Sequence, residues 1–456
     1  MSDPERRAAD SPHDTIVAPA TPPGVGGIAV VRISGPAVPD IGRAMLGALP
    51  APRQAAYRGF RDAEGELLDR GIALYFPAPH SFTGEPVLEL QGHGGPVVVA
   101  ALADAAIALG ARRAAPGEFS ERAFLNGRLD LAQAEAIADL VASGSAQAAR
   151  AALRSLSGDF SRAVDALAAQ LTELRVHVEA AIDFPEEEID FLSDAALTAR
   201  LQACAEAFAS LLERARAGRA LADGFRVVIV GRPNAGKSSL LNRLAGQEAA
   251  IVTEVAGTTR DVLRERIDLD GLVVELVDTA GLRSDPDRIE AEGIRRAREA
   301  LASADAVLVL RDASAGPDGG LPPDEPLPAG VPVLLVDNKI DLTGAAAGAG
   351  AGEPAAVAVS ALTGAGFADL RARLRAMAGQ GDVGEGTFTA RRRHIDAISR
   401  AFTHFTDGRD ALERTGAGEL LAEELKLAHD ALGEVTGRVT SDDLLGRIFA
   451  EFCIGK

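Results

Sequence analysis

Short apolar runs alternate with turn residues over the first part of the chain, residues 15–126. The runs are Ile16–Ala18, Ile28–Ile33, Ile72–Phe76 and Val87–Leu90, and a helical pattern follows at Val97–Leu109. Short runs bounded by glycine and proline are typical of strands and turns. The pattern predicts an α+β module, preceded by a short disordered tail at residues 1–14.

From residue 127 the pattern becomes helical. Apolar residues recur every three or four positions, which places them on one face of a helix. They are Leu153, Leu156, Phe160, Val164, Leu167, Leu171, Leu174, Val178 and Ile182. We expect one long helix that ends at Asp183, because Pro185 cannot continue it. Helical periodicity returns after a Gly-rich linker at 380–386, so residues 127–222 and 380–456 are predicted to form one discontinuous helical domain.

Residues 223–379 show continuous β-branched runs that alternate with helical stretches. Such runs indicate parallel strands that are buried on both faces of a sheet. The runs are Val227–Val230, Val273–Val277, Val307–Leu310, Val331–Val336 and Val357–Val359. We therefore expect an α/β domain with a mostly parallel sheet, inserted into the helical domain.

Charge and composition exclude several classes of function. The 456 residues contain 47 Lys+Arg against 66 Asp+Glu, a net charge of −19, which argues against a general nucleic-acid coat protein. An aromatic content of 4% without Trp argues against a base-stacking platform. The two cysteines form no disulfide framework, and neither a secretory signal nor an apolar run of roughly 18 residues is present. These features predict a cytoplasmic protein without a membrane span.

A phosphate-binding loop follows the strand Val227–Val230. Gly231-Arg232-Pro233-Asn234-Ala235-Gly236-Lys237-Ser238 connects this strand to a helix. Its glycines let backbone N–H groups surround phosphates at a helix N-terminus, where Lys237 would reach the β- and γ-phosphates and Ser238 would bind Mg²⁺.

Further segments follow in the order of a guanine-nucleotide-binding domain. Asp278 ends one strand and can support the Mg²⁺ shell, and Thr259 of Thr258-Thr259-Arg260-Asp261 is assigned as its second protein ligand. Asp341 accepts hydrogen bonds only, which suits the two N–H donors of guanine. The predicted nucleotide contacts are Asn234, Ala235, Gly236, Lys237, Ser238, Ser239, Asp278, Thr279, Ala280, Gly281, Asn338, Lys339, Asp341, Ser360, Ala361 and Leu362.

Leu282 stands where Ras-like GTPases place the glutamine that orients the attacking water. A leucine cannot form hydrogen bonds, so another group must orient the water and another cation must neutralise the developing charge. Downstream carboxylates are the candidates for the water: Asp285, Asp287, Glu290 and Glu292.

The chain as a whole resembles the MnmE (TrmE) family of tRNA-modification GTPases. The resemblance covers all but the first dozen residues and rests on segments outside the GTP-binding motifs. They are residues 20–24, 31–35, 81–85, 90–95, 116–124 and 444–449, with the terminal Phe452-Cys453-Ile454-Gly455-Lys456.

The resemblance implies a homodimer that acts on tRNA with an FAD-dependent partner, MnmG. The pair would add a carboxymethylaminomethyl or aminomethyl group to C5 of the wobble uridine. A 5,10-methylene- or 5-formyl-tetrahydrofolate would bind the N-terminal module. Its contacts would be Arg32, Glu89, Arg128 and Lys456, with Arg128 standing where the family usually has Lys.

The family also implies a potassium ion, bound when two GTP-binding domains meet, and Glu290 as the residue that orients water. The potassium ligands would be Asn234, Thr253, Val255 and Thr258. Further GTP contacts would come from Thr253, Glu254, Val255, Ala256, Gly257, Thr258 and Thr259.

Three alternatives remain open from the residues. Cys453 is either a packed cysteine or, as the family resemblance implies, a catalytic thiol at the folate or substrate site, since a C-terminal Gly-Lys fits a prenylation box poorly. The basic run Arg391-Arg392-Arg393-His394 either contacts RNA or the partner or is a solvated helix face. For the function of the whole protein, a ribosome-assembly switch GTPase is one alternative, because it would share the phosphate loop and Leu282. A non-catalytic nucleotide-dependent scaffold is another, but it would not need the intact Lys237 and Ser238.

Overall fold

The computed structural model describes residues 14–183, 195–247, 264–269, 272–278, 300–315, 331–349, 356–378, 387–440, 442–450, 452 and 455. The chain divides into two compact units. The N-terminal unit comprises residues 1–138 and 436–456, and the central unit comprises residues 139–435. Each is described by itself.

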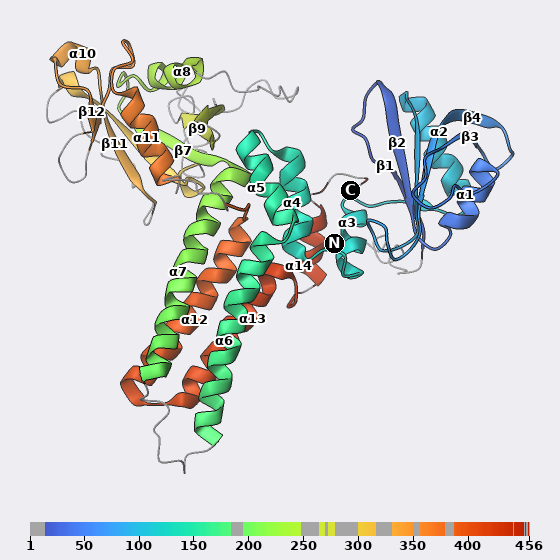
Figure 1. Cartoon of the computed structure of the whole chain (residues 1–456). Helices are drawn as coiled ribbons and strands as arrows, with labels where there is room; N and C mark the ends of the chain where they lie inside the picture. The colour runs from blue at the N-terminus through green and yellow to red at the C-terminus, as the bar shows by residue number, and fades with distance from the viewer. Residues whose placement is uncertain are drawn as a thin grey trace, which may run out of the picture. The chain divides into compact units, whose positions relative to one another are not determined.

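A six-stranded sheet forms the centre of the N-terminal unit (Figure 1). Its order is β3-β4-β5-β2-β1-β6, antiparallel except for the parallel pair β1–β6. The strands are β1 (Ile16–Pro19), β2 (Gly26–Ser34), β3 (Ala56–Arg61), β4 (Leu67–Phe76), β5 (Val87–Gly94) and β6 (Arg112–Arg113). This arrangement has the mixed α+β character expected from the sequence.

The two faces of this sheet are covered differently. Helices α1 (Val38–Leu46) and α2 (Pro96–Ala108) pack on the face that carries Val31 and Ile33. Because side chains alternate along a strand, Arg32 points to the other face. That face is covered beside β1 by α3 (Glu118–Leu125), through a small cluster of Ile16, Ala18, Ala114 and Phe119.

The end of the chain returns to the N-terminal unit. Helix α14 (Asp442–Ala450) packs on the first turns of α4 (Leu131–Ala142). The shared core contains Leu131, Ala134, Leu445, Ile448, Phe449 and Phe452.

Long helices form one part of the central unit, and Figure 1 shows α6, α7, α12 and α13 lying side by side. Their bounds are α5 (Ala146–Leu156), α6 (Asp159–Asp183), α7 (Ala195–Asp223), α12 (Arg392–Thr415) and α13 (Gly418–Thr436). The expectation of one helix through residues 153–182 is wrong. Gly158 has a left-handed φ of +85°, which ends α5 and starts α6 in a new direction while the apolar spacing continues.

The chain leaves α7 directly into a seven-stranded sheet of order β12-β13-β11-β10-β7-β9-β8. Strands β13, β11, β10, β7 and β9 are parallel, and β12 and β8 are antiparallel edges. The strands are β7 (Phe225–Gly231), β8 (Arg264–Leu269), β9 (Leu272–Asp278), β10 (Ala306–Asp312), β11 (Val333–Asn338), β12 (Gly348–Ala349) and β13 (Val357–Ala358).

Both faces of this sheet are buried, as the continuous β-branched runs predicted. Helices α8 (Lys237–Gln247) and α11 (Phe367–Met377) pack against Val227, Ile229 and Leu308. The opposite face buries Val228 and Val230 in a second cluster. In the described part of the chain no helix is both long and apolar enough to cross a membrane.

Candidate functional site

The phosphate loop lies between β7 and α8. Asn234 and Gly236 both have positive φ, +64° and +96°, so the loop folds back over the start of the helix. Lys237 is 7% exposed, and its ammonium donates hydrogen bonds to the carbonyls of Gly231 at 2.8 Å and Arg232 at 3.0 Å. The lysine charge is thus held inside the loop, at a helix N-terminus where anionic phosphates bind favourably. Ser238 lies in the first turn of α8.

Asn338 connects the phosphate loop to a second loop. The side chain is 2% exposed. Its Nδ2 donates to the Ala235 carbonyl at 2.9 Å, and its Oδ1 accepts from the Ala361 N–H at 3.0 Å. A Cβ on Gly236 would collide with Nδ2, so this contact requires glycine at that position. One buried amide therefore fixes the spacing between residues 235 and 361.

Two carboxylates adjoin Asn338. The Lys339 ammonium donates to Asp312 at 2.6 Å, and this bond, with one from Ser314, holds the pKa of Asp312 below its ordinary value. The Ser360 hydroxyl donates to Asp341 at 2.5 Å. Lys339 has a left-handed φ of +68°, which turns the chain so that Asp341 follows at the start of the short helix α10 (Ile340–Thr343). The sequence identified Asn338, Lys339 and Asp341 but not their partners Asp312 and Ser360 in these roles.

The strand register shows why these segments meet. Gly231 is opposite Leu310, Asn338 is opposite Asp312, and the Asp278 backbone is opposite Ile229. The carboxyl ends of these parallel strands thus lie at the same end of the sheet, which is where ligands of such sheets bind.

Several predicted site residues lie outside the described residues. They are Thr253, Glu254, Val255, Ala256, Gly257, Thr258, Thr259, Thr279, Ala280, Gly281, Leu282, Glu290, Cys453 and Lys456. Their roles, and those of Mg²⁺ and K⁺, stay predictions. In the described part of the chain, no group of three His, Cys, Asp or Glu side chains could hold a metal ion.

A second candidate site lies on the sheet of the N-terminal unit. Arg32 on β2 and Glu89 on β5 are cross-strand partners and form an ion pair at 2.9 Å. Both bonds from Arg32 end on Oε1 of Glu89. The guanidinium carbon lies 5.6 Å from the ring centre of Phe82 and 5.8 Å from that of Phe119. The family resemblance identified Arg32 and Glu89, but no feature of the sequence indicated a role for Phe82 and Phe119 beside them.

The chain's end reaches this pair. Arg32 Nη1 donates to the Gly455 carbonyl at 3.4 Å. Gly455 has a φ of +99°, and a Cβ there would collide with the Pro19 carbonyl, so only glycine fits. Arg128 lies against Gly84, where an added Cβ would meet its Cγ at 3.3 Å. Residues 82–84 therefore touch both Arg32 and Arg128.

A partly buried ionic network supports this region. Asp14, Glu85 and Glu118 surround the guanidinium of Arg122, at 2.5, 3.2 and 2.9 Å. Arg112 also pairs with Asp14 and Glu118. Burial raises the pKa of Asp14 and Glu118, but hydrogen bonds from Arg112 and Arg122 outweigh burial and hold both pKa values below their ordinary range. The network joins α3, β6 and the loop before β5.

Most side chains of the basic run at residues 391–394 form contacts within the protein. Arg391 pairs with Asp139 at 2.8 Å, and Arg393 donates to the carbonyls of residues 434 and 435 at the end of α13. His394 is 2% exposed, and its Nδ1 accepts from the Arg391 N–H. These contacts favour a structural role over an RNA-binding surface.

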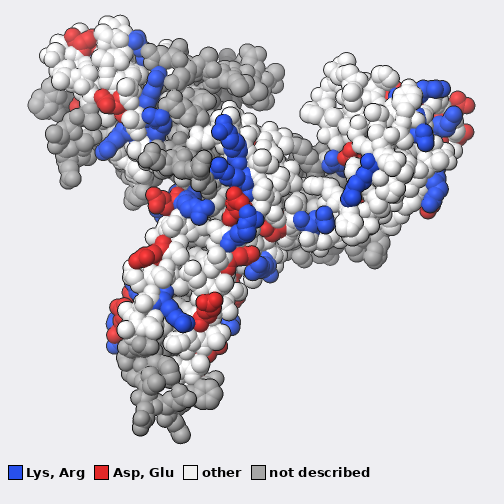
Figure 2. All heavy atoms as spheres, viewed as in Figure 1, with Lys and Arg blue, Asp and Glu red and all other residues white. Residues whose placement is uncertain are grey.

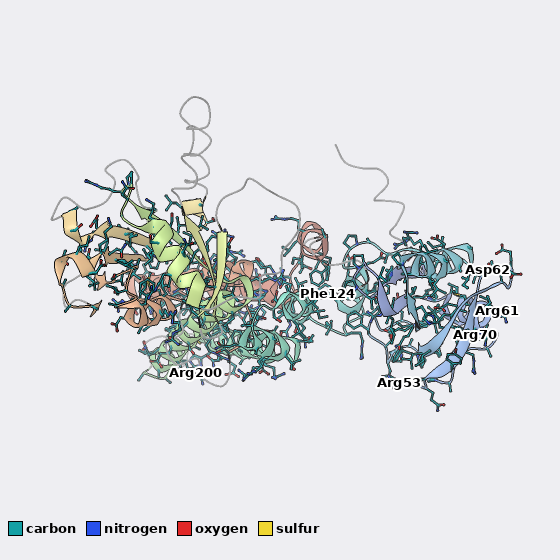
Figure 3. The ribbon with its side chains drawn as sticks, turned by 90° about the horizontal axis from the view of Figure 1, so that it is seen from above. Arg53, Arg61, Asp62, Arg70, Phe124 and Arg200 are labelled. Atoms are coloured by element: carbon teal, nitrogen blue, oxygen red, sulfur yellow. The ribbon has the colours of Figure 1, made fainter. Side chains whose placement is uncertain are left out.

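Charged side chains of both signs are interspersed over the face seen in Figure 2. At the turn of the β3–β4 hairpin of the N-terminal unit, Arg61 and Arg70 lie near Asp62, and Arg53 lies apart from them (Figure 3). The hairpin is therefore not a patch of a single sign.

The strand, loop and helix around Lys237, with the Asn338 and Asp341 segments beside them, define a P-loop guanine-nucleotide-binding domain carried by a helical protein. The family model of the MnmE helical domain matches residues 131–453, and that of the GTP-binding protein TrmE N-terminus matches residues 15–128.

Full-length relatives agree with these matches. A tRNA modification GTPase MnmE from Alkalilimnicola ehrlichii is 57% identical over 97% of this chain and 99% of its own. One from Marinobacter nauticus is 55% identical over 97% and 99%. Among solved structures, the FeoB G-domain from Methanococcus jannaschii covers 34% of this chain and 97% of its own, with 21% identity and a TM-score of 0.25.

The chain belongs to the MnmE family of tRNA modification GTPases. The predicted family, fold class and GTPase enzyme class are thereby confirmed.

Proposed function

We propose that this protein hydrolyses GTP as part of wobble-uridine modification in tRNA. In this proposal it acts as a homodimer with the FAD-dependent partner MnmG, in the cytoplasm, and adds a carboxymethylaminomethyl or aminomethyl group at C5. One observation carries the proposal. The same chain holds a phosphate loop with a buried lysine and, in its N-terminal unit, an Arg–Glu pair between aromatic rings that contacts the chain's end.

The central unit supplies the GTP chemistry. Lys237 balances phosphate charge, Asp341 accepts the guanine N–H groups, and Ser238 offers a hydroxyl for a Mg²⁺ shell shared with phosphate oxygens. The fit rests on geometry, since the positive φ at Asn234 and Gly236 shapes a loop at the N-terminus of α8, and glycine at residue 236 lets the Asn338 amide pack against that loop. Bound Mg²⁺ would neutralise charge on the phosphates.

Leu282 supports the second part of the proposal. It cannot orient water, so Glu290 takes that role and a potassium ion held by Asn234, Thr253, Val255 and Thr258 adds positive charge. The left-handed backbone at Asn234 supports its assignment as a ligand at the loop's tip.

The Arg32–Glu89 pair suits the heterocycle of a tetrahydrofolate. Oε2 of Glu89 has no hydrogen bond within the described residues, and the two side chains are 22% and 17% exposed, so the pair is accessible. A carboxylate oxygen beside aromatic rings can accept N–H groups of a flat heterocycle while the rings cover its face. Arg128 and Lys456 would complete the site.

Exposed apolar side chains support dimerisation. Tyr57 and Ile72 are cross-strand partners that are 66% and 40% exposed, and Val25 and Ile28 on or before β2 are 91% and 72% exposed. Apolar groups at one sheet commonly mark an interface, and a second copy of this chain is the proposed occupant.

Profiling of wobble-uridine modification in cells that lack this gene tests the main proposal. We expect the C5 group to be lost and to return with the wild-type gene. A normal modification profile would refute it. No observation favours a ribosome-assembly switch, because the family models match both the N-terminal unit and the helices.

Base recognition is tested by Asp341→Asn. An amide in place of the carboxylate should shift preference from guanine to xanthine nucleotides, because xanthine has a carbonyl where guanine has its amino group. Competition binding with GDP and xanthosine diphosphate measures the shift. Unchanged guanine preference would show that the base is read elsewhere.

A further inference from the structure

Arg243 on α8 bridges from the helix behind the phosphate loop to the loop formed by residues 360–365. Its Nη1 donates to the Leu362 carbonyl at 2.9 Å, and its Nη2 donates to the Thr363 carbonyl at 2.8 Å. Two separate donors of one guanidinium thus bind two successive carbonyls. This fork geometry is specific to arginine, since a lysine ammonium is a single point donor.

The loop that Arg243 binds also orients the groups assigned to guanine. Ser360 Oγ donates to Asp341 at 2.5 Å and accepts from the Thr363 N–H at 3.1 Å. The neighbouring Ala361 N–H donates to Asn338 at 3.0 Å. A chain of hydrogen bonds therefore links Arg243 to Asp341. Arg243 binds the Thr363 carbonyl, the Thr363 N–H binds Ser360, and Ser360 binds Asp341.

Gly364 makes room for this clamp. Its φ is +88°, a conformation that disfavours side chains, and a Cβ there would collide with Nη2 of Arg243. The positive φ strains any other residue at position 364, and a side chain there would also have to displace the end of Arg243. The position of the guanidinium on the loop is given by its two hydrogen bonds.

We propose that Arg243 is a positioning residue for guanine recognition: it clamps residues 362 and 363 so that Ser360 holds Asp341 in place. The inference rests on the proposed GTP-binding function and adds to it a link from α8 to the base-reading loop. Arg243 itself touches no nucleotide in this proposal. Its effect passes through Ser360.

The test compares Arg243→Ala and Arg243→Lys with the wild-type full-length chain. Calorimetry with GDP and with GTP gives affinities, and steady-state hydrolysis gives kcat and KM. Arg243→Ala should weaken GDP and GTP equally, by about three- to tenfold for two partly exposed hydrogen bonds. KM should rise by a similar factor while kcat at saturating GTP stays at the wild-type value, because the base contacts are equal in ground and transition states.

Arg243→Lys distinguishes hydrogen bonding to both carbonyls from the effect of the positive charge alone. It keeps the positive charge and most of the stem, but one ammonium cannot span both carbonyls, so its affinities should stay closer to Arg243→Ala than to wild type. Full recovery with lysine would overturn the proposal in favour of electrostatic attraction. Should Arg243→Ala prove unfolded by circular dichroism, the lysine variant carries the same comparison.

Matched controls complete the design. Arg373, an exposed arginine on α11 of the same domain, should tolerate alanine without change in GDP affinity. Gly364→Ala should reproduce the affinity loss from the loop side. Affinities of Arg243→Ala within about twofold of wild type, or a fall in kcat at constant KM, would overturn the positioning role. Failure of the wild-type chain to bind GDP would instead refute the GTP-binding function.

Discussion

Asn338→Ala should uncouple the phosphate loop from the base-reading loop. The buried amide donates to the Ala235 carbonyl at 2.9 Å and accepts from the Ala361 N–H at 3.0 Å. Alanine removes both bonds, and residues 235 and 361 are themselves only 2% and 9% exposed, so water cannot easily replace the amide. A buried polar group that loses its partner costs about 1–3 kcal/mol, so the two together cost about 2–6 kcal/mol.

Hydrogen-exchange mass spectrometry measures this cost locally. Peptides from β7 and α8 should exchange at least about thirtyfold faster in the variant without nucleotide, since 1.4 kcal/mol is tenfold in an equilibrium constant. GDP affinity, measured by calorimetry, should fall at least about tenfold, because binding must restore the spacing of the two loops.

Two controls test the reasoning. Asn338→Asp keeps an acceptor for Ala361 but faces the Ala235 carbonyl with a second acceptor, so it should lose stability as well. Asn242→Ala removes an exposed asparagine of α8 and should change neither measurement. Wild-type exchange rates and GDP affinity in Asn338→Ala would refute the idea that this amide couples the loops.

Three further outcomes follow from the two sites. Glu89→Gln should weaken 5-formyl-tetrahydrofolate binding in calorimetry, since the carboxylate charge is lost; unchanged affinity would remove Glu89 from the site. Arg122→Met should lower the free energy of unfolding by about 3 kcal/mol at pH 7, because it leaves the buried Glu118 and the partly exposed Asp14 and Glu85 short of a partner. Asp14 and Glu118 have lowered pKa values, so the stability they contribute is complete above their ordinary pKa values of about 4 and is lost as the pH falls below them. In urea unfolding, the difference in stability between wild type and Arg122→Met should therefore shrink below about pH 4. A difference that stays constant with pH would contradict this assignment. GTP turnover should be faster in K⁺ than in Na⁺, and equal rates in both salts would remove the proposed role of potassium. Turnover should also fall in Glu290→Ala with little change in GDP affinity, and full activity of this variant would remove the proposed role of Glu290.

The sequence predicted best those features that depend on neighbouring residues. The phosphate loop was recognisable because the strand, the glycines and the helix start follow one another directly. The buried strands β7, β10 and β11 were recognisable because both faces are covered and the runs are continuously apolar. Residues 231–238 and 338–341 were assigned to one nucleotide site from the order of their motifs, and the parallel strands place both segments at the same end of the sheet.

Edge strands and helix breaks were harder to predict. Strand β8 carries Arg264, Glu265, Arg266 and Asp268 among its six residues, with Ile267 and Leu269 buried, so its apolar pattern is weak. It is an antiparallel edge strand that, within the described residues, pairs with β9 alone. Gly158 was missed because apolar spacing of three or four continues across it, although the backbone turns there.

The individual side-chain contacts between distant segments could not be predicted from the sequence pattern. Arg243 appeared as one arginine among many, and Asn338 as part of a motif rather than a link between two loops. Both contacts are formed entirely between protein groups, so they can order the two loops without help from the nucleotide. Ordered loops lower the entropy cost of binding, and we expect the Asn338 amide and the Arg243 guanidinium to supply that order in this domain. Loss of either should therefore reduce affinity rather than the rate of the chemical step. Loss of Glu290, the proposed water-orienting carboxylate, should do the opposite.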